Sequence, residues 1–168
     1  MNDTKKIFAI SGLCTGCRTC EVACAVAHSK SNTIWGAITE LPAPRYRIEI
    51  QTVGEVKLPL NCRQCDEPDC LFACKAGAVS KDPEDGQVKL NLDKCVGCWM
   101  CVMVCPFGAV TPDEGSSKAL KCDLCEGRSE GPACVSSCPT HALIYGTIDN
   151  ARAYLKNLGN KGIVIKSA

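Results

Sequence analysis

Cysteine dominates the chemistry that is available to this chain. Sixteen of the 168 residues are cysteine, and they fall into four groups of four with none left over. A cysteine thiolate can act as a nucleophile, as half of a disulfide or as a metal ligand. The spacing of the cysteines and the compartment of the protein decide among these uses.

The spacing within the groups is typical of iron–sulfur ligands. The first and third groups read C-x2-C-x2-C-x3-C, the second widens the middle gap to four residues, and the fourth widens it to eight. Two intervening residues let the chain wrap so that successive sulfurs converge, and three such thiolates hold three corners of a 4Fe-4S cluster. In chain order, the groups are Cys14, Cys17, Cys20 and Cys24; Cys62, Cys65, Cys70 and Cys74; Cys95, Cys98, Cys101 and Cys105; and Cys122, Cys125, Cys134 and Cys138.

Zinc and disulfides fit this pattern less well. Structural zinc usually takes two separated pairs of ligands, which leaves no place for a third cysteine at x2 spacing. Disulfides belong to oxidising compartments, but only four apolar residues (7–10) follow the N-terminal lysines, which is too short for a secretory signal. We therefore expect four 4Fe-4S clusters in a cytoplasmic protein that can associate with the periphery of a membrane complex. A structural zinc protein without redox activity is the alternative.

Charge and the remaining motifs exclude several function classes. The formal net charge is +1 with no basic block, so no nucleic-acid partner is expected, and no apolar run approaches the 18 residues of a membrane span. The chain lacks a G-x-G-x-x-G motif, a P-loop and an evident nucleophile–base pair. Because every cluster can be fully ligated by cysteine, the sequence predicts an electron carrier and not an enzyme.

The flanks of the cysteine groups repeat and predict the local structure. The segments CLFACKAGAV, CVMVCPFGAV and CVSSCPTHALI end the last three groups alike, as expected for a duplicated loop, helical turn and strand. Between the groups, alternating residues predict a hairpin of strands 45–53 and 55–60 around Gly54, and a strand over 88–92 after a turn at 82–86. A helix over 150–158 is expected, capped by Asp149 and ended by Gly159.

The segments CTGCRTCEVACAVAHS, CRQCDEPDCLFACKAGAV, CVGCWMCVMVCPFGAV and CDLCEGRSEGPACVSSCPTHAL together resemble four-cluster ferredoxin-like electron-transfer subunits. That family includes the beta subunits of molybdopterin oxidoreductases and formate dehydrogenases. Within it, the chain looks most similar to the iron–sulfur protein of anaerobic carbon monoxide dehydrogenase. The resemblance covers about residues 7–146. It implies an α+β fold in which two ferredoxin-like modules of short strands, short helices and long loops surround the clusters.

The resemblance also implies that the ligands are used in crossed pairs, with groups one and four sharing two clusters and groups two and three sharing the others. In a single unit of residues 1–168, module A would comprise 1–30 and 115–146, and module B 60–112, with a hairpin insertion at 42–60 and a C-terminal helix over 147–168. Ala25 and Lys75 replace the proline that follows the fourth cysteine in the other groups, which weakens the helix stop. The implied ligand sets are Cys14, Cys17, Cys20 and Cys138; Cys122, Cys125, Cys134 and Cys24; Cys62, Cys65, Cys70 and Cys105; and Cys95, Cys98, Cys101 and Cys74.

The implied function is electron relay from an anaerobic catalytic partner. By resemblance the donor is carbon monoxide dehydrogenase, and the acceptor is a hydrogenase or a flavoprotein that reduces NAD(P). The alternative is the beta subunit of a molybdopterin enzyme such as formate dehydrogenase. His28 and His141 are surplus as ligands beside sixteen cysteines. Lys94 and Lys121 precede ligands directly and are either counter-charges to clusters or exposed side chains.

Overall fold

The protein consists of short elements arranged as antiparallel ribbons, as expected for an α+β fold of ferredoxin-like type. The computed structural model describes residues 4–113 and 115–160. Within these residues, each sheet is a two-stranded antiparallel ribbon. The ribbons pair β1 (Lys6–Ala9) with β8 (Leu143–Gly146), β2 (Ile48–Val53) with β3 (Val56–Asn61), β4 (Val79–Lys81) with β5 (Val88–Leu90), and β6 (Val110–Asp113) with β7 (Lys118–Lys121).

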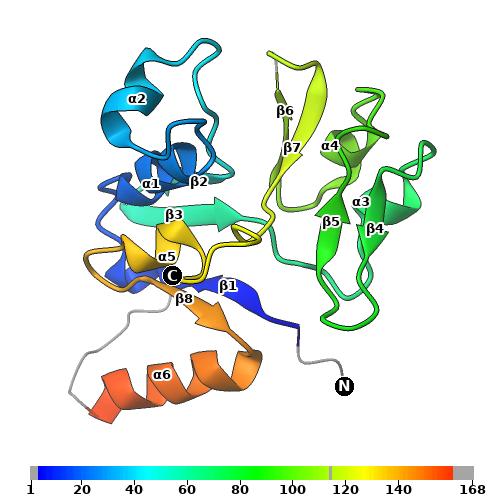
Figure 1. The fold of residues 1–168 in the computed structure, drawn as a ribbon. Helices are drawn as coiled ribbons and strands as arrows, with labels where there is room; N and C mark the ends of the chain where they lie inside the picture. The colour runs from blue at the N-terminus through cyan, green and yellow to red at the C-terminus, as the bar shows by residue number, and fades with distance from the viewer. Residues whose placement is uncertain (1–3, 114, 161–168) are drawn as a thin grey trace.

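Short helices follow the cysteine loops, and one longer helix lies near the end of the chain (Figure 1). The helices are the 3-10 turn η1 (Ser11–Leu13), α1 (Thr19–Ala27), α2 (Ile34–Thr39), α3 (Asp69–Phe72), α4 (Met100–Val104), α5 (Ala133–Ser136) and α6 (Ile148–Asn160). None of the helices in the described part of the chain has the length and apolar character that a membrane span requires.

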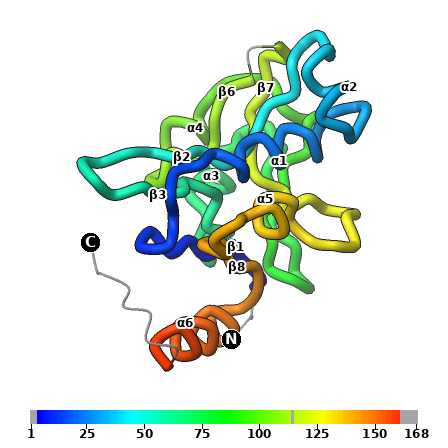
Figure 2. Tube along the Cα trace, turned by 90° about the vertical axis from the view of Figure 1, so that its left-hand side faces the viewer, coloured from blue at the N-terminus to red at the C-terminus, as the bar shows by residue number. Residues whose placement is uncertain are grey.

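The β1–β8 ribbon pairs the first strand of the chain with the last one described. Lys6 pairs with Gly146 and Ile7 pairs with Tyr145, and the Ile7 side chain is 1% exposed. Figure 2 shows the two strands side by side, with α6 beyond them. Since the ribbon precedes the first cysteine group and follows the fourth, it holds these two groups in the same half of the molecule.

The strands predicted between the groups are present. In the hairpin, Val53 pairs with Val56 across Gly54, and β2 begins at Ile48, three residues later than its sequence pattern suggested. The turn at 82–86 and the strand after it are also found, although β5 ends at Leu90. The alternating pattern of β2 matches its burial: Ile48 and Ile50 pack into the core, whereas Val53 is exposed at the hairpin tip.

The limits predicted for the C-terminal helix were wrong at both ends. Thr147, not Asp149, caps α6, because the Thr147 hydroxyl accepts from the Asn150 N–H at 3.3 Å. The helix also continues through Gly159 to Asn160. Gly159 is not among the glycines with positive φ, so it does not adopt the left-handed conformation with which a glycine ends a helix. The C-terminal helical segment was also predicted to span 147–168, and residues 161–168 of it lie outside the described residues.

The residue after the fourth cysteine affects helix length in only one group. With Ala25 after Cys24, α1 continues to Ala27, whereas α4 ends just before Cys105 and Pro106. Lys75 has no such effect, because α3 already ends at Phe72. The expected weakening of the helix stop therefore holds for the first group and not for the second.

Cysteines make up much of the core. The larger apolar cluster contains ten buried residues, of which five are cysteine: Cys20, Cys24, Cys62, Cys122 and Cys134. A smaller cluster is built around Cys101, Val110 and Ala119. Since few large side chains fill the interior, the packing of this fold depends on what the cysteines hold.

Candidate metal centres

The four cysteine loops share one backbone feature. In each group, the residue just before the second cysteine has a positive φ: +73° at Gly16, +47° at Gln64, +69° at Gly97 and +57° at Leu124. This left-handed conformation is unfavourable for residues other than glycine, so Gln64 and Leu124 adopt it at a cost in conformational free energy. Turns of this kind form concave sets of backbone N–H groups that bind anions. A cluster held by four thiolates is such an anion.

Cysteines from different groups line the same cavities. In three cavities, three cysteines of one group meet the fourth cysteine of another group. The sets are Cys14, Cys17, Cys20 and Cys138 in the first cavity; Cys62, Cys65, Cys70 and Cys105 in the second; and Cys95, Cys98, Cys101 and Cys74 in the third. Apolar residues, prolines and a few polar or charged residues complete the linings, including Pro139 and Arg18 in the first and Pro106, Asp69 and Lys121 in the second.

The remaining four cysteines lie next to the first set. Cys24, Cys122 and Cys134 are buried in the larger apolar cluster. Cys125 lines an open cavity of about 530 Å³ together with His28 and Asp123. The structure thus brings Cys24 of the first group to the fourth group, and Cys138 of the fourth group to the first.

Burial and mutual charge make these thiols poor anions without a cation. Burial raises the pKa of Cys20 to about 11 and that of Cys122 to about 12, and it raises the pKa of Cys134 still further. Burial likewise raises the pKa of Cys65, and the nearby charge of Cys105 adds to this effect although the two belong to different groups.

All sixteen cysteines are free thiols. The protein therefore offers three sets of soft sulfur ligands around cavities and four further cysteines beside the first set, and the ionisation of the buried thiols needs a compensating positive charge. A cationic iron–sulfur core supplies that charge, so the residues fit a 4Fe-4S cluster.

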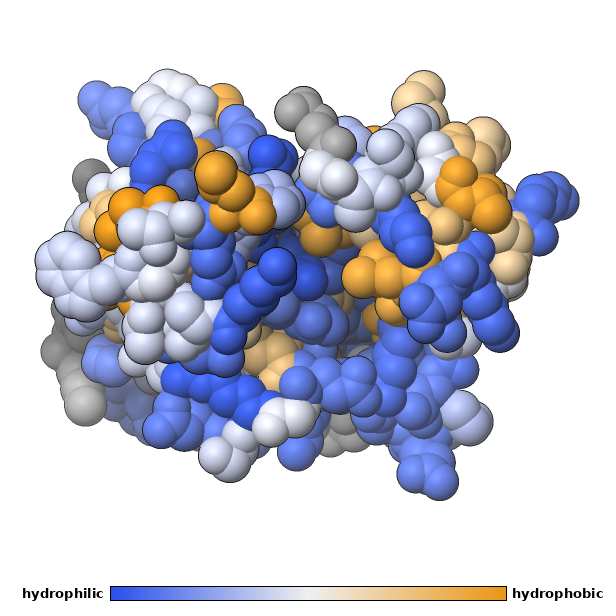
Figure 3. All heavy atoms as spheres, turned by 45° about the horizontal axis from the view of Figure 1, so that its top comes forward, coloured by the Kyte–Doolittle hydropathy of each residue, from blue (hydrophilic) through white to orange (hydrophobic). Residues whose placement is uncertain are grey.

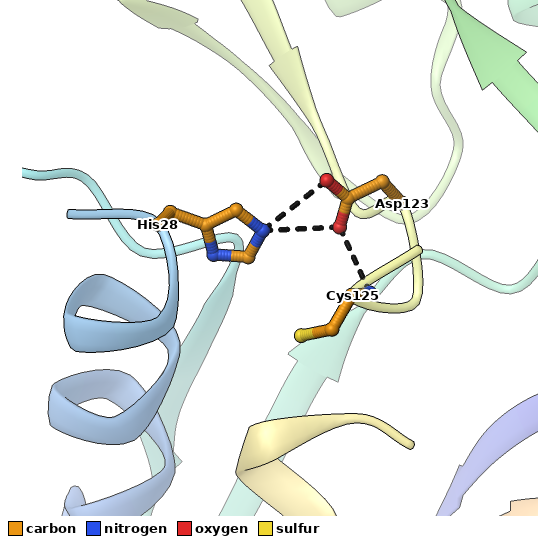
Figure 4. Close-up of side chains that lie close together, drawn as sticks. All are labelled: His28, Asp123 and Cys125. Atoms are coloured by element: carbon orange, nitrogen blue, oxygen red, sulfur yellow. Dashed lines mark hydrogen bonds and ion pairs between the residues drawn. The ribbon is translucent and has the colours of Figure 1, made fainter. Parts of the chain in front are cut away.

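His28 forms an ion pair at the edge of the fourth set (Figure 4). Its Nε2 lies 3.1 Å from Asp123 Oδ1, and its Nδ1 lies 2.7 Å from the carbonyl oxygen of Cys24. Burial opposes protonation of His28, but the bonds to Asp123 and Cys24 outweigh it and raise the pKa to about 9. Burial also acts against ionised Asp123, yet its hydrogen bond with His28 helps to lower its pKa to about 2.

In this pair the positive charge of His28 lies near Cys24, with Nδ1 3.7 Å from Cys24 Sγ, and the negative charge of Asp123 lies near Cys125. Cys125 also donates its N–H to Asp123 at 3.0 Å, so Asp123 orders the fourth loop while it orients the imidazole. Sequence reasoning set His28 aside because sixteen cysteines suffice as ligands, and it could not foresee the pairing with a residue 95 positions away. His141 has no comparable position: it is exposed and has a positive φ after Cys138.

Comparison with known proteins identifies the family. Residues 55–148, which contain the last three cysteine groups, match the family described as a 4Fe-4S dicluster domain. This protein belongs to the 4Fe-4S dicluster family. The zinc alternative finds no support in this match.

Relatives of the dicluster protein extend the similarity to the first group. The chain is 39% identical over 166 residues to an iron–sulfur protein of Rhodospirillum rubrum, covering 89% of this chain and 86% of the relative. It is also 39% identical over 153 residues to the electron transport protein HydN of Escherichia coli K12, covering 82% and 85%. The B subunit of the anaerobic dimethyl sulfoxide reductase of the same strain is 38% identical over 153 residues, covering 86% and 74%. The dicluster protein is thus an iron–sulfur protein of electron transfer, and not a catalyst.

Proposed function

We propose that this protein carries four 4Fe-4S clusters as a relay between two redox partners. The clusters would be held by the crossed ligand sets: three cysteines from one loop and the fourth cysteine of the paired group. The observation that carries the proposal is the meeting of Cys105 with the second group and of Cys74 with the third in separate cavities. The division into modules A and B is part of the same proposal.

Shared packing supports a linear order of the four sets. Cys20 of the first set packs with Cys24, Cys122 and Cys134 of the fourth-group set, and Cys62 of the second-group set joins the same apolar cluster. Cys70 and Cys105, also of that set, pack against the smaller cluster, which contains buried Cys101. The second-group set therefore touches both clusters of side chains, and the order runs from the Cys14 set to the Cys95 set through the interior.

A bound 4Fe-4S cluster supplies one-electron redox chemistry with little rearrangement. The chain itself keeps the interior dry and the sets close together. It also supplies cations such as His28 beside the sulfur ligands.

The two ends of this order reach the surface. Cys17 and Cys98 are the exposed cysteines, one in each terminal set, and the other fourteen are buried or half-buried. The loop and helix around Cys98 also expose apolar side chains, with Val96 74% and Met103 80% exposed. Figure 3 shows apolar surface in the half that contains α4, across a hydrophilic hollow from the other half. We expect electrons to enter and leave near these two cysteines.

Carbon monoxide dehydrogenase is the donor that the sequence resemblance favours, with a hydrogenase or an NAD(P)-reducing flavoprotein as acceptor. A second candidate is the electron-transfer subunit of a molybdopterin enzyme such as formate dehydrogenase. Similarity to a subunit of an anaerobic reductase favours this second candidate specifically.

Anaerobic purification and EPR spectroscopy test the relay. Four clusters predict about 16 irons per chain and reduced-cluster signals after treatment with dithionite. Iron near zero, or no reduced signal at full iron content, would refute the proposal.

Co-purification from anaerobically grown cells tests the partner. Recovery of carbon monoxide dehydrogenase supports the first candidate. Recovery of a molybdenum enzyme without it would reverse the ranking.

A further inference from the structure

Lys121 is a lysine buried in the interior of the protein. The residue is 5% exposed, at the end of β7 and directly before Cys122. Its Nζ donates to the carbonyl oxygens of Val88 and Cys122, the latter at 3.1 Å, and lies 3.5 Å from Gln64 Oε1. All three partners are acceptors. A protonated amine has three N–H donors and a neutral amine only two, so this arrangement fits the ammonium form.

This charge has no anion beside it in the described part of the protein. Across residues 4–113 and 115–160, no carboxylate forms an ion pair with Lys121 within 4.0 Å. Glu21, the other buried charged side chain described, is paired with Arg18 at 3.3 Å. A buried charge without a counter-ion is costly. The site of Lys121 therefore suits an anion that the protein itself does not provide.

The cavity next to Lys121 is the one proposed to hold such an anion. Lys121 lines it together with Cys62, Cys65, Cys70 and Cys105, and Arg63 and Asp69 line it as well. Burial raises the pKa of Cys70 to about 11, and the positive charge of Lys121 is the largest influence that opposes this rise. The ammonium thus acts electrostatically on the second-group ligand set.

We propose that Lys121 is a redox-tuning residue, whose charge makes the cluster bound by Cys62, Cys65, Cys70 and Cys105 easier to reduce. The inference rests on the proposed function, since it requires that this set holds a cluster. Reduction adds one negative charge and no proton to the cluster. A fixed cation in a dry site stabilises that added charge more than it would in water, so it raises the midpoint potential. This cluster then holds an electron at a higher ambient potential than it would without the Lys121 charge.

Lys94 provides a matched control. It precedes the first cysteine of the third group as Lys121 precedes that of the fourth, in the sequences KCVGC and KCDLC. Lys94 is exposed, however, where water screens its charge. The same motif position therefore carries one buried lysine and one solvated lysine.

EPR-monitored redox titration of the anaerobic holoprotein tests the proposal. The variants are Lys121→Met, Lys121→Gln, Lys121→Arg and Lys94→Met, and Cys65→Ser identifies the signal of the second-group cluster. In Lys121→Met and Lys121→Gln we expect that signal to have at least a tenfold lower ratio of reduced to oxidised cluster at a fixed ambient potential. For a one-electron couple this corresponds to a shift of about 59 mV to more negative potential. Lys121→Arg and Lys94→Met should titrate as the wild type.

Each outcome decides for or against the role of Lys121. Selective loss of the Cys65-dependent signal in both neutral variants would also support it, provided that the Lys121→Arg variant, which keeps the charge, retains the signal. An unchanged midpoint in the neutral variants, an equal shift in Lys94→Met, or loss of all clusters in both neutral variants would overturn it. A wild type without any cluster signal would instead refute the proposed function, so the two failures are distinguishable.

Discussion

Replacing Cys105 with serine tests the crossed use of ligands, because Cys105 belongs to the third group by sequence but lines the cavity of the second. If the ligand sets are crossed, Cys105→Ser and Cys65→Ser damage the same cluster. Cys98→Ser damages another, although Cys98 and Cys105 share one motif. The comparison therefore separates a shared cavity from a shared sequence motif.

The magnitude follows from the ligand sets. Four clusters correspond to about 16 irons per chain, and loss of one ligand leaves about 15 irons if one iron dissociates or about 12 if the cluster is lost. The double variant Cys65→Ser/Cys105→Ser should lose at most the four irons of one cluster and retain about 12. Cys98→Ser/Cys105→Ser should lose the sum of both, down to about 8 irons. Such non-additivity within one set and additivity between sets are the expected signs of coupled and independent sites.

The assay is iron analysis together with EPR of the dithionite-reduced protein, purified without oxygen. The signals missing from Cys105→Ser should match those missing from Cys65→Ser. If they match those missing from Cys98→Ser, or if Cys65→Ser/Cys105→Ser loses the iron of two clusters, the crossed assignment is refuted.

Three further predictions concern stability. A Cβ on Gly97, where φ is +69°, would overlap the carbonyl oxygen of Ser117, whereas a Cβ on Gly108, where φ is +58°, would meet open space. The free energy of unfolding, measured with a denaturant, should therefore be lower for Gly97→Ala than for Gly108→Ala by about 1–3 kcal/mol. Because the pKa of His28 is raised from 6.5 to about 9, its pair with Asp123 stabilises the fold fully below pH 6.5 and is lost as the pH rises towards 9. His28→Ala should flatten the decline of unfolding free energy over that range, and an equally steep decline in the variant would contradict the assignment. Removal of iron by a chelator should abolish cooperative thermal unfolding followed by circular dichroism, since half of the ten residues in the larger core cluster are cysteine; a sharp transition in the iron-free protein would count against a cluster-dependent core.

Much of the local structure could be predicted from residue patterns. The β2–β3 hairpin follows from alternation of residues around Gly54, and the short helices follow from the repeated flanks of the cysteine groups. The C-terminal helix was predicted with wrong ends, because Asp149 and Gly159 are typical terminal residues that do not have the cap geometry here. Such boundaries depend on single hydrogen bonds and backbone angles, which composition does not determine.

Residues with long-range partners could not be assigned in this way. His28 lies 95 residues from Asp123, and nothing near either residue indicates the pairing. Lys94 and Lys121 occupy the same position in their motifs, yet one is exposed and the other is buried. Burial arises because β7 packs against the second-group cavity, and that contact joins segments more than 50 residues apart.

By itself, the sequence determined that this protein is an iron–sulfur electron carrier, because sixteen thiols at ligand spacing have few other uses and the spacing is a local property of the polypeptide. The tertiary structure decided which thiols meet and which charges face them. In three cavities one loop supplies three sulfurs, and the fourth comes from a segment that folding alone brings near. The strength of a charge likewise depends on its exclusion from water, and that is a property of the folded interior.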